Sequence, residues 1–238
     1  MKALVLAAGR GTRMDHLTDD RPKPLINIKG KPFLHYVLES IRKAGIEDIG
    51  IVVGYKKEMV EEYFKSRSYS SDPGLKLTFI DQKEQLGTGH AIKTGKQWSS
   101  GNGFVVMMGD NIYSPNDIKS ISNDDAYCYA AGFKHEHPER FGVLMTSGNH
   151  LDGIVEKPSN PKSNMVNTGL YKFTPEIFSA LDRIGKSERG EYEITDAINL
   201  LCKDDKVRLI RIQDYWVNFG RPEDIPGVED FIGSRSDA

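Results

Sequence analysis

The first 110 residues alternate between short apolar runs and amphipathic segments, and this alternation restricts the fold more than any other feature. The apolar runs have the length of strands, and the segments between them repeat their apolar residues at intervals of three and four, as helices do. The expected strands are residues 2–6, 49–53, 75–80 and 104–108, and the expected helices are residues 34–41, 59–64 and 91–98. Strands that are apolar on both faces are typical of parallel sheets covered by helices on each side. We therefore expect an α/β fold that begins with a Rossmann-like parallel sheet.

The pattern changes after Ser114, where short strands are separated by turn residues. The expected elements are strands at 126–132, 142–146, 154–156, 167–173 and 207–212, with helices at 175–181 and 194–201. Short strands joined by turns favour antiparallel pairing. No linker or shift in composition separates the two parts, so we expect one domain over residues 1–238. Its fold class is α/β, a mixed sheet with an inserted antiparallel sheet that faces the substrate.

Charge is distributed unevenly along the chain. The net charge of −2 argues against a general nucleic-acid-binding protein. Residues 1–31, however, hold seven Lys and Arg against three acidic residues. No apolar stretch approaches the roughly 20 residues of a membrane span, and Arg10 and Arg13 interrupt any signal-peptide pattern. We expect a cytoplasmic protein with no membrane or nucleic-acid partner, whose anionic ligand binds near the N-terminus. The oligomeric state stays open, and a homo-oligomer is one of the alternatives.

The first expected strand ends in two glycines interleaved with arginines, Gly9-Arg10-Gly11-Thr12-Arg13. Glycines let backbone N–H groups approach phosphate oxygens, and an arginine fork matches two oxygens at once. The dinucleotide fingerprint needs a third glycine where this chain has Met14, and a Walker A loop is absent. These residues alone leave two interpretations, a phosphate-binding loop and a tight turn with solvated arginines.

The longer segment LAAGRGTRMDHLTDDRPKPLINIKGKPFLHYVLE resembles the N-terminal motif of the sugar-1-phosphate nucleotidylyltransferases, of the glucose-1-phosphate thymidylyltransferase and N-acetylglucosamine-1-phosphate uridylyltransferase types. It carries the L-A-A-G-x-G-T-R, P-K-P-L and G-K-P elements and departs at His16, where many members have Pro. The resemblance implies that the glycine loop wraps a nucleoside triphosphate and that Arg13 and Lys23 hold its phosphates. It extends over roughly residues 1–225.

A second stretch, DQKEQLGTGHAI at residues 81–92, resembles the uracil-reading loop of the uridylyltransferases. The resemblance implies that Gln82 and the backbone around Gly87 and Thr88 contact a pyrimidine. A glutamine amide can donate and accept hydrogen bonds, which suits a uracil or thymine edge. The nucleotide-binding residues expected from both stretches are Leu6, Ala8, Gly9, Gly11, Thr12, Arg13, Gln82, Gly87 and Thr88.

Two positions are expected to hold Mg²⁺. Asp110 ends the strand in VVMMGDNIY, at the rim where the glycine loop also lies, and a carboxylate there suits Mg²⁺. YWVNFGRPED resembles the W-x-D-x-G-T element of thymidylyltransferases, but Asn218 replaces the acid and Arg221 replaces the Thr. The uridylyltransferases carry Asn at this metal position within a V-N motif, so the departure favours uridylyl specificity. In the same stretch, Trp216 is expected in the core.

The sugar side is expected to come from the second half of the chain. GIVEKPSNPKSNMVNTGLYKF resembles the E-K-P and N-T-G-L-Y elements of the family, ERFGVL supplies a matching glycine, and RGEYEITDAIN resembles R-G-E-x-E-I-T-D. The resemblance implies that Glu156 accepts from sugar hydroxyls and that Lys157 pairs with the sugar phosphate. The expected substrate-binding residues are Gly142, Glu156, Lys157, Asn167 and Glu193.

Together these patterns predict transfer of a nucleotidyl group from a pyrimidine nucleoside triphosphate to a sugar 1-phosphate of the glucose or N-acetylglucosamine type, with Mg²⁺ as cofactor. UTP is favoured and dTTP stays open. Residues 1–114 would mainly bind the nucleotide and residues 115–225 the sugar phosphate, with Arg13, Lys23 and Lys157 as catalytic cations.

Three alternatives are weighed against this function. They are a cytidylyltransferase acting on a non-sugar phosphate, a binding protein that no longer turns over sugar nucleotides, and a nicotinamide-dependent dehydrogenase. Met14, in place of the third glycine of the dinucleotide fingerprint, argues against the dehydrogenase. The bifunctional uridylyltransferases carry a β-helix acetyltransferase domain after the nucleotidyltransferase domain. We expect no such C-terminal domain in this chain.

Overall fold

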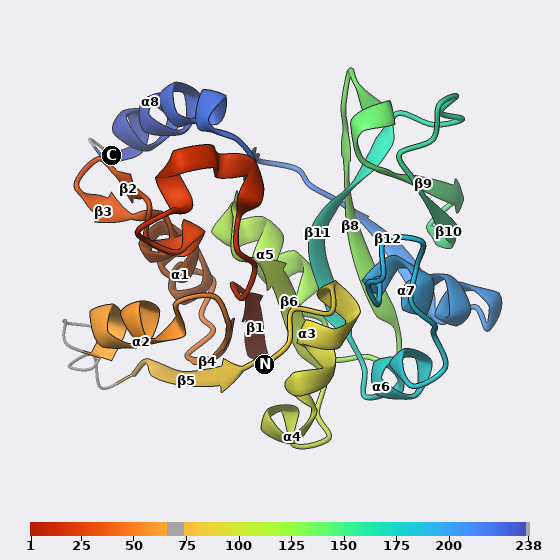
Figure 1. Cartoon of the computed structure of the whole chain (residues 1–238). Coiled ribbons are helices and arrows are strands. Elements are labelled where there is room, and N and C mark those ends of the chain that lie inside the picture. The colour runs from red at the N-terminus through yellow and green to blue at the C-terminus, as the bar shows by residue number, and fades with distance from the viewer. Residues whose placement is uncertain (66–73, 237–238) are drawn as a thin grey trace.

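The computed structural model describes residues 1–65 and 74–236, and within them the chain forms one large mixed sheet with helices on both faces (Figure 1). The sheet has nine strands in the order β5-β4-β1-β6-β11-β8-β12-β10-β9. This is the mixed α/β architecture expected from the alternation of apolar runs and amphipathic segments.

The first half of the sheet is parallel, as predicted. Its strands are β1 (Lys2–Leu6), β4 (Asp48–Val53), β5 (Lys76–Asp81) and β6 (Phe104–Met108). β1 pairs with β4 on one side and with β6 on the other, each in parallel register. Every parallel strand ends at the same edge, so the residues after β1, β5 and β6 reach one rim.

The second half of the sheet is largely antiparallel, as expected. β11 (Met165–Phe173) is antiparallel to both β6 and β8 (Cys128–Lys134) and thereby joins the two halves. β9 (Gly142–Ser147) and β10 (His150–Glu156) form an antiparallel pair at the far edge. β12 (Val207–Arg211) departs from this pattern, because it runs parallel to β8.

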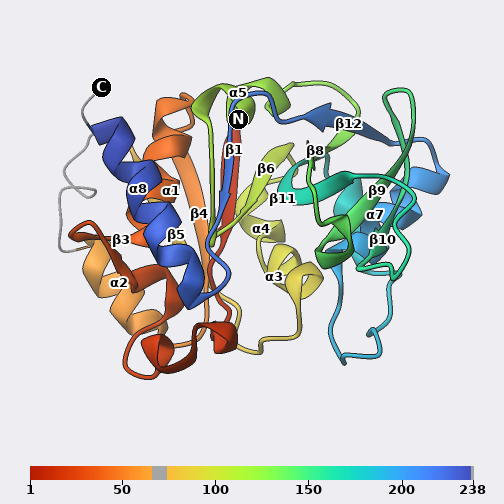
Figure 2. The ribbon, with the colours of Figure 1, turned by 90° about the horizontal axis from the view of Figure 1, so that it is seen from above.

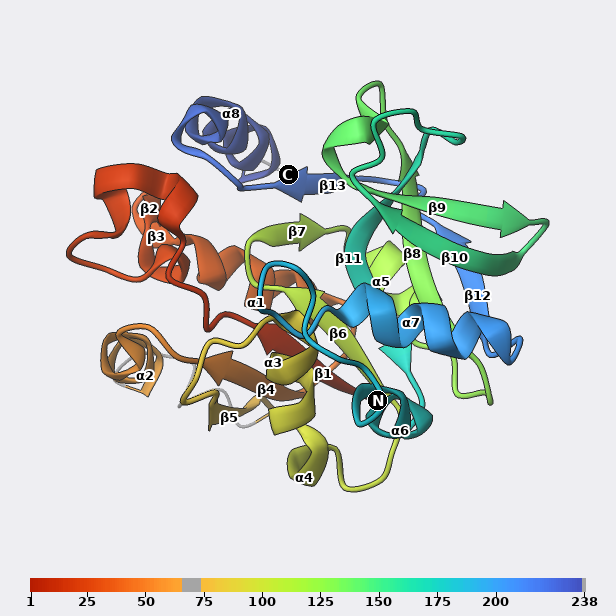
Figure 3. The same cartoon turned by 45° about the vertical axis from the view of Figure 1, so that its right-hand side comes forward.

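The helices pack on the two faces according to the period-two alternation of strand side chains. Ala3 and Val5 point to one face, where α1 (Phe33–Lys43), α2 (Lys57–Lys65), α5 (Pro115–Ile121) and α8 (Ile225–Ser236) pack. Leu4 points to the other face, where α3 (Thr88–Thr94), α6 (Glu176–Leu181) and α7 (Ile194–Lys203) pack. Figure 3 shows α3 and α7 in front of the sheet and α1 and α5 behind it. Each face therefore has its own hydrophobic core.

Among the described residues, two small ladders and three short 3-10 turns lie outside the large sheet. β2 (Asn27–Ile28) pairs with β3 (Lys31–Pro32), and β7 (Asn111–Tyr113) pairs with β13 (Trp216–Asn218). The turns at Lys23–Leu25, Pro138–Arg140 and Pro222–Asp224 join neighbouring elements. α8 contacts β2, and in the view from above it crosses the part of the molecule that holds β3 and α1 (Figure 2).

Two further sequence expectations differ from the structure. The single helix expected at 91–98 is two helices, α3 and α4 (Lys96–Ser99), which meet at Gly95. A Cβ on Gly95 would come within 2.8 Å of Leu4 Cδ2, so a side chain at the break would crowd the packing on β1. Trp216 is half-buried, not in the core. In the described part of the chain, no helix is both long and apolar enough to cross a bilayer.

The half-buried His35 in α1 links stability to pH. Burial, assisted by the positive charge of Lys31, lowers its pKa from 6.5 to about 4. As the pH falls below 6.5, the unfolded chain binds a proton at this site before the folded chain does, so folding stability is lost between these values. We expect wild type to lose about 1 kcal/mol more unfolding free energy than His35→Gln between about pH 7 and about pH 5. Urea denaturation measures this difference, and parallel losses in both proteins would contradict it.

Candidate active site

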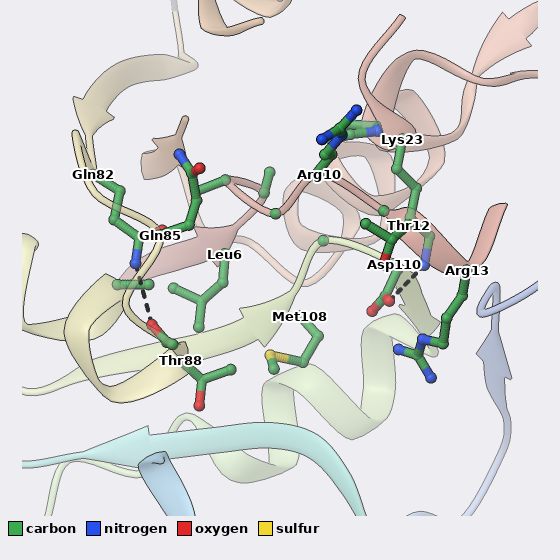
Figure 4. Close-up of a pocket in the computed structure, with 18 of the residues that line it drawn as sticks. Leu6, Arg10, Thr12, Arg13, Lys23, Gln82, Gln85, Thr88, Met108 and Asp110 are labelled. Carbon is green, nitrogen blue, oxygen red and sulfur yellow. Dashed lines mark hydrogen bonds and ion pairs between the residues drawn. The ribbon is translucent and has the colours of Figure 1, made fainter. Parts of the chain in front are cut away.

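A cavity of about 470 Å³ opens at the carboxyl ends of β1 and β6. Figure 4 shows two ends, with Lys23, Asp110 and Arg13 gathered at one and Gln82 and Thr88 at the other. The cavity therefore combines a charged end with an end that presents amide and hydroxyl groups. Its lining includes the nine expected nucleotide-binding residues, Leu6, Ala8, Gly9, Gly11, Thr12, Arg13, Gln82, Gly87 and Thr88, together with Lys23 and Asp110.

The glycine loop is shaped by a left-handed turn at Gly11. Gly11 has φ +71°, and a Cβ there would lie 2.8 Å from the Cβ of Lys23. The loop enters a 3-10 helix, η1 (Thr12–Thr18), whose Met14 is fully buried in the core. Met14 stands where the dinucleotide fingerprint has its third glycine, so here that position anchors the loop to the core. Gly11 is needed for both the turn and the close approach of Lys23.

The charged end contains an ion pair between distant segments. Lys23 Nζ donates to Asp110 Oδ2 at 2.7 Å, and the Lys23 side chain is nearly buried. Lys23 begins the short 3-10 turn after the loop, whereas Asp110 follows β6. Arg13 also lines this end and is exposed. Two cations and one carboxylate therefore converge where a polyphosphate can lie.

The other end holds a glutamine whose orientation is fixed. Gln82 is 4% exposed, and its Nε2 donates to the Gly87 carbonyl at 3.1 Å and lies 3.2 Å from Nδ1 of His90. A Gln nitrogen can only donate, so His90 Nδ1 accepts. The amide nitrogen is thus occupied by protein, and Oε1 is the atom left to accept from a ligand.

The loop at residues 86–89 is held by a segment from the second half of the chain. Gly89 N donates to the Tyr192 carbonyl, Tyr192 N donates to the Leu86 carbonyl, and Ile194 N donates to Oγ1 of Thr88. A Cβ on Gly87, whose φ is +100°, would lie 2.7 Å from the Tyr192 carbonyl oxygen. Because the Thr88 hydroxyl accepts from α7, its side chain connects the two halves of the molecule.

Three of the expected substrate-binding residues lie close together. A Cβ on Gly142 would lie 3.1 Å from Glu156 Oε1 and 3.5 Å from the Cβ of Asn167. Asn167 Nδ2 donates to the Tyr171 hydroxyl at 2.6 Å. Asn167 lies on β11, and two residues further along this strand Gly169 packs against Met108, which lines the cavity.

The remaining two expected residues differ in their surroundings. Glu193 is 9% exposed, and its Oε1 accepts from Arg189 at 2.8 Å and from Ser187 at 3.1 Å. Lys157 is exposed and directly follows Glu156, and its N–H donates to the Phe141 carbonyl. Glu156 is exposed, yet partial desolvation by the surrounding protein raises the pKa of its carboxyl. The positive charges of Arg189 and Lys157 act in the opposite direction but do not outweigh this effect.

The residues expected to hold Mg²⁺ are brought close together by β7 and β13. Asn218 lies opposite Asn111, the residue after Asp110, and Phe219 N donates to the Asp110 carbonyl at 2.9 Å. Asn218 Oδ1 lies beside Gly220, where a Cβ would come within 2.8 Å of it, and Gly220 lines the cavity. One carboxylate and one amide oxygen at a phosphate-sized cavity fit Mg²⁺, which usually takes few protein ligands and completes its shell with phosphates and water.

Comparison with known proteins decides the family. The family model described as nucleotidyl transferase matches residues 2–234. The chain belongs to the nucleotidyl transferase family. The resemblance noted at the glycine loop therefore extends over almost the whole chain.

The relatives of this chain include proteins named for different activities. It is 40% identical over 227 residues to the "Bifunctional protein GlmU" of Methanocaldococcus jannaschii, a match that covers 94% of this chain and 52% of that protein. It is 37% identical over 231 residues to the "UTP--glucose-1-phosphate uridylyltransferase AglF" of Haloferax volcanii, covering 94% of this chain and 93% of that protein. The chain spans about half the length of the GlmU proteins it matches.

A solved structure supports the fold of this chain. The UDP-glucose pyrophosphorylase solved in complex with UDP-glucose has a TM-score of 0.86 and 26% identity, and the match covers 98% of both chains. The mixed sheet and the helices on its two faces are thus the fold of a known nucleotidyltransferase.

Sequence reasoning missed several residues of the cavity. Gln85, Met108, Glu191 and Gly220 line it without having been expected there. Gln85 lies inside the E-Q-L-G-T-G motif, so the motif could have identified it. Glu191 reaches the cavity only because the segment around Tyr192 pairs with residue 86, a non-local contact that no local pattern signals.

Gly11 and Gly9 offer a matched pair of substitutions. Gly11→Ala places a Cβ against Lys23 at positive φ, and we expect a loss of about 1–3 kcal/mol of unfolding free energy. Gly9 has open space around an added Cβ, so Gly9→Ala should stay within about 0.5 kcal/mol of wild type. Urea denaturation without ligand measures both. Equal stabilities of the two variants would rule out the left-handed turn as the reason for Gly11.

Proposed function

We propose that this nucleotidyl transferase transfers a uridylyl group from UTP to a sugar 1-phosphate, giving a UDP-sugar and pyrophosphate. The observation that carries the proposal is the two-ended cavity, with cations and a carboxylate at one end and a fixed glutamine amide at the other. The relative AglF is named for UTP and glucose 1-phosphate, and the similar pyrophosphorylase was solved with UDP-glucose bound. An N-acetylglucosamine-type sugar remains a second acceptor to test.

The glutamine supports a base with a hydrogen-bond donor at its edge. Because Nε2 of Gln82 already donates to Gly87, its Oε1 would accept from the ligand. Uracil and thymine carry an N–H at ring position 3, whereas cytosine has an acceptor there. We infer that the fixed amide favours UTP or dTTP over CTP.

The chemistry has to overcome repulsion between two phosphorylated reactants. The sugar phosphate oxygen is already an anion, so it attacks the α-phosphorus in line without a general base, and pyrophosphate leaves. Two unit charges about 4 Å apart repel by roughly 4 kcal/mol at an effective dielectric of about 20. Arg13 and Lys23 would offset this repulsion from the nucleotide side, and Lys157 from the sugar side. Residues 1–114 thus mainly serve the nucleotide and residues 115–225 mainly the sugar phosphate.

Asp110 and Asn218 would hold Mg²⁺, which when bound supplies positive charge against the phosphate oxygens. Asp110 is held by Lys23 in the ligand-free protein. Once a triphosphate lies at this end, Lys23 can donate to phosphate oxygens, which frees the Asp110 carboxylate. The protein groups alone therefore provide both the cation that binds phosphate and the carboxylate that binds metal.

The sugar would lie beside Gly142, Glu156 and Asn167. Gly142 leaves room next to Glu156 Oε1, so a sugar ring can approach the carboxylate. Glu156 accepts from sugar hydroxyls in its charged form. Glu193 would contribute through its bond to Arg189 or by contacting the sugar directly.

The proposal is tested by pyrophosphate release with four triphosphates, UTP, dTTP, CTP and ATP. The acceptors are three sugar 1-phosphates, including those of glucose and N-acetylglucosamine, and one non-sugar phosphate. We expect the highest kcat/KM with UTP and a sugar 1-phosphate, and loss of turnover in Asp110→Ala. Faster reaction of CTP with a non-sugar phosphate would point to a cytidylyltransferase. Binding of UDP-sugar without any pyrophosphate release would point to a binding protein.

Arg13 is expected to act mainly in the transition state. Its fork would donate to phosphate oxygens that gain charge during transfer, so Arg13→Ala should lower kcat by roughly 10²- to 10³-fold. Arg13→Lys keeps the charge but loses the fork, and we expect it to recover part of the activity. Steady-state kinetics at saturating UTP measure both. A rise in KM at unchanged kcat would make Arg13 a binder of the ground state instead.

A further inference from the structure

Asn111 lies buried between the two residues proposed to hold Mg²⁺. It is 3% exposed, and its amide makes three hydrogen bonds. Nδ2 donates to Asp110 Oδ1 at 2.9 Å, while Oδ1 accepts from Trp216 Nε1 at 2.7 Å and from Asn218 Nδ2 at 3.0 Å. The side chain thus touches both proposed metal ligands and the indole of Trp216.

The chemistry of these partners permits only one orientation of the Asn111 amide. An indole N–H can donate but cannot accept, so the atom that faces Trp216 must be the oxygen. An ionised carboxylate can only accept, so the atom that faces Asp110 must be the nitrogen. Both neighbours require the same orientation.

The fixed Asn111 oxygen then determines the orientation of Asn218. Only a donor can face Asn111 Oδ1, so Asn218 must present Nδ2 to it. The Asn218 carbonyl oxygen is consequently turned away, beside Gly220 on the wall of the cavity. The missing Cβ of Gly220 leaves the space next to that oxygen open.

We propose that Trp216 and Asn111 are positioning residues that turn the Asn218 amide oxygen toward the phosphate end of the cavity. The inference rests on the proposed function, because it takes Asn218 as a metal ligand. Neither Trp216 nor Asn111 needs to touch substrate for this role.

The small β7–β13 ladder explains why the side chains of Asn111, Trp216 and Asn218 meet next to Asp110. Asn218 lies directly opposite Asn111 in the antiparallel register, so their side chains share one face. Trp216 is two residues before Asn218 and points to the same face. There its ring packs against Phe133 and Phe141, with centroids 6.0 Å and 5.5 Å away. The indole is thereby held with its N–H on Asn111.

The same geometry explains an amide where other members of the family carry an acid. An aspartate at 218 would place a carboxylate oxygen against Asn111 Oδ1, two acceptors with no proton between them. With Asn111 fixed by Trp216, an amide at 218 can both donate to Asn111 and offer an oxygen to the cavity, whereas an ionised carboxylate cannot donate. The amide of Asn218 therefore fits the hydrogen bonding of Asn111 and Trp216, which a carboxylate would not.

The test measures the affinity of Mn²⁺, as a spectroscopic substitute for Mg²⁺, for the enzyme–UTP complex without sugar phosphate, using the EPR signal of free Mn²⁺. Trp216→Phe keeps an aromatic ring against Phe133 and Phe141 but removes the indole donor. We expect it to weaken Mn²⁺ binding roughly 10-fold, as for other groups that orient a metal ligand. In an Asn218→Ala background the same substitution should have no further effect, since it acts through Asn218.

A second replacement tests the indole N–H without changing the ring size. Uniform replacement of tryptophan by its benzothiophene analogue substitutes sulfur for the N–H, and the same loss is expected. The chain has two tryptophans, and Nε1 of the other, Trp98, is buried without a hydrogen-bond partner. Removing that N–H breaks no bond, so the measured effect belongs to Trp216.

The outcomes separate this inference from the proposed function. Unchanged Mn²⁺ affinity in Asn218→Ala would overturn Asn218 as a metal ligand, and the inference with it. A loss in Asn218→Ala together with unchanged affinity in Trp216→Phe and in the benzothiophene protein would overturn the positioning role alone. An equal loss from Trp216→Phe in both backgrounds would also overturn it, because the effect would then not pass through Asn218.

Discussion

The ion pair between Lys23 and Asp110 brings together the elements on which the site depends. Lys23 reaches Asp110 because Gly11 has no Cβ to keep it away, and Asp110 stands at that rim because β1 and β6 are parallel neighbours. A nearly buried ammonium beside a carboxylate forms a neutral unit that a polyphosphate and a divalent cation can separate into two binding partners. The Lys23–Asp110 ion pair therefore depends on both the glycine loop and the parallel sheet, and the proposed chemistry depends on the ion pair.

Much of the nucleotide side could be predicted from the sequence because its geometry follows from local rules. Parallel strands end at one edge, and this rule alone predicts that residues 9–13, Gln82 and Asp110 share a rim, as they do. The positive φ of Gly11 is likewise a local property. Met14 shows the limit of local reasoning. It excluded a dinucleotide fingerprint, but only the fold shows that it anchors the loop in the core.

The rest could not be predicted because it depends on pairing between distant segments. The parallel return of β12 beside β8 leaves no local trace, and neither does the contact of Tyr192 with the base-side loop. Trp216 was expected in the core because a tryptophan amid apolar residues usually packs there. The structure keeps it half-buried with its N–H on Asn111, which only the register of β7 with β13 reveals. Family resemblance named Asn218, but the reason for an amide there lies in that register.

The most direct measurement of the central claim is a crystal structure of the protein with UTP and Mg²⁺, without a sugar phosphate. The account predicts the triphosphate against residues 9–13, with Lys23 Nζ on a phosphate oxygen and more than about 4 Å from Asp110, beyond the range of an ion pair. A triphosphate bound away from this loop, or one bound there with the Lys23–Asp110 pair intact, would contradict it.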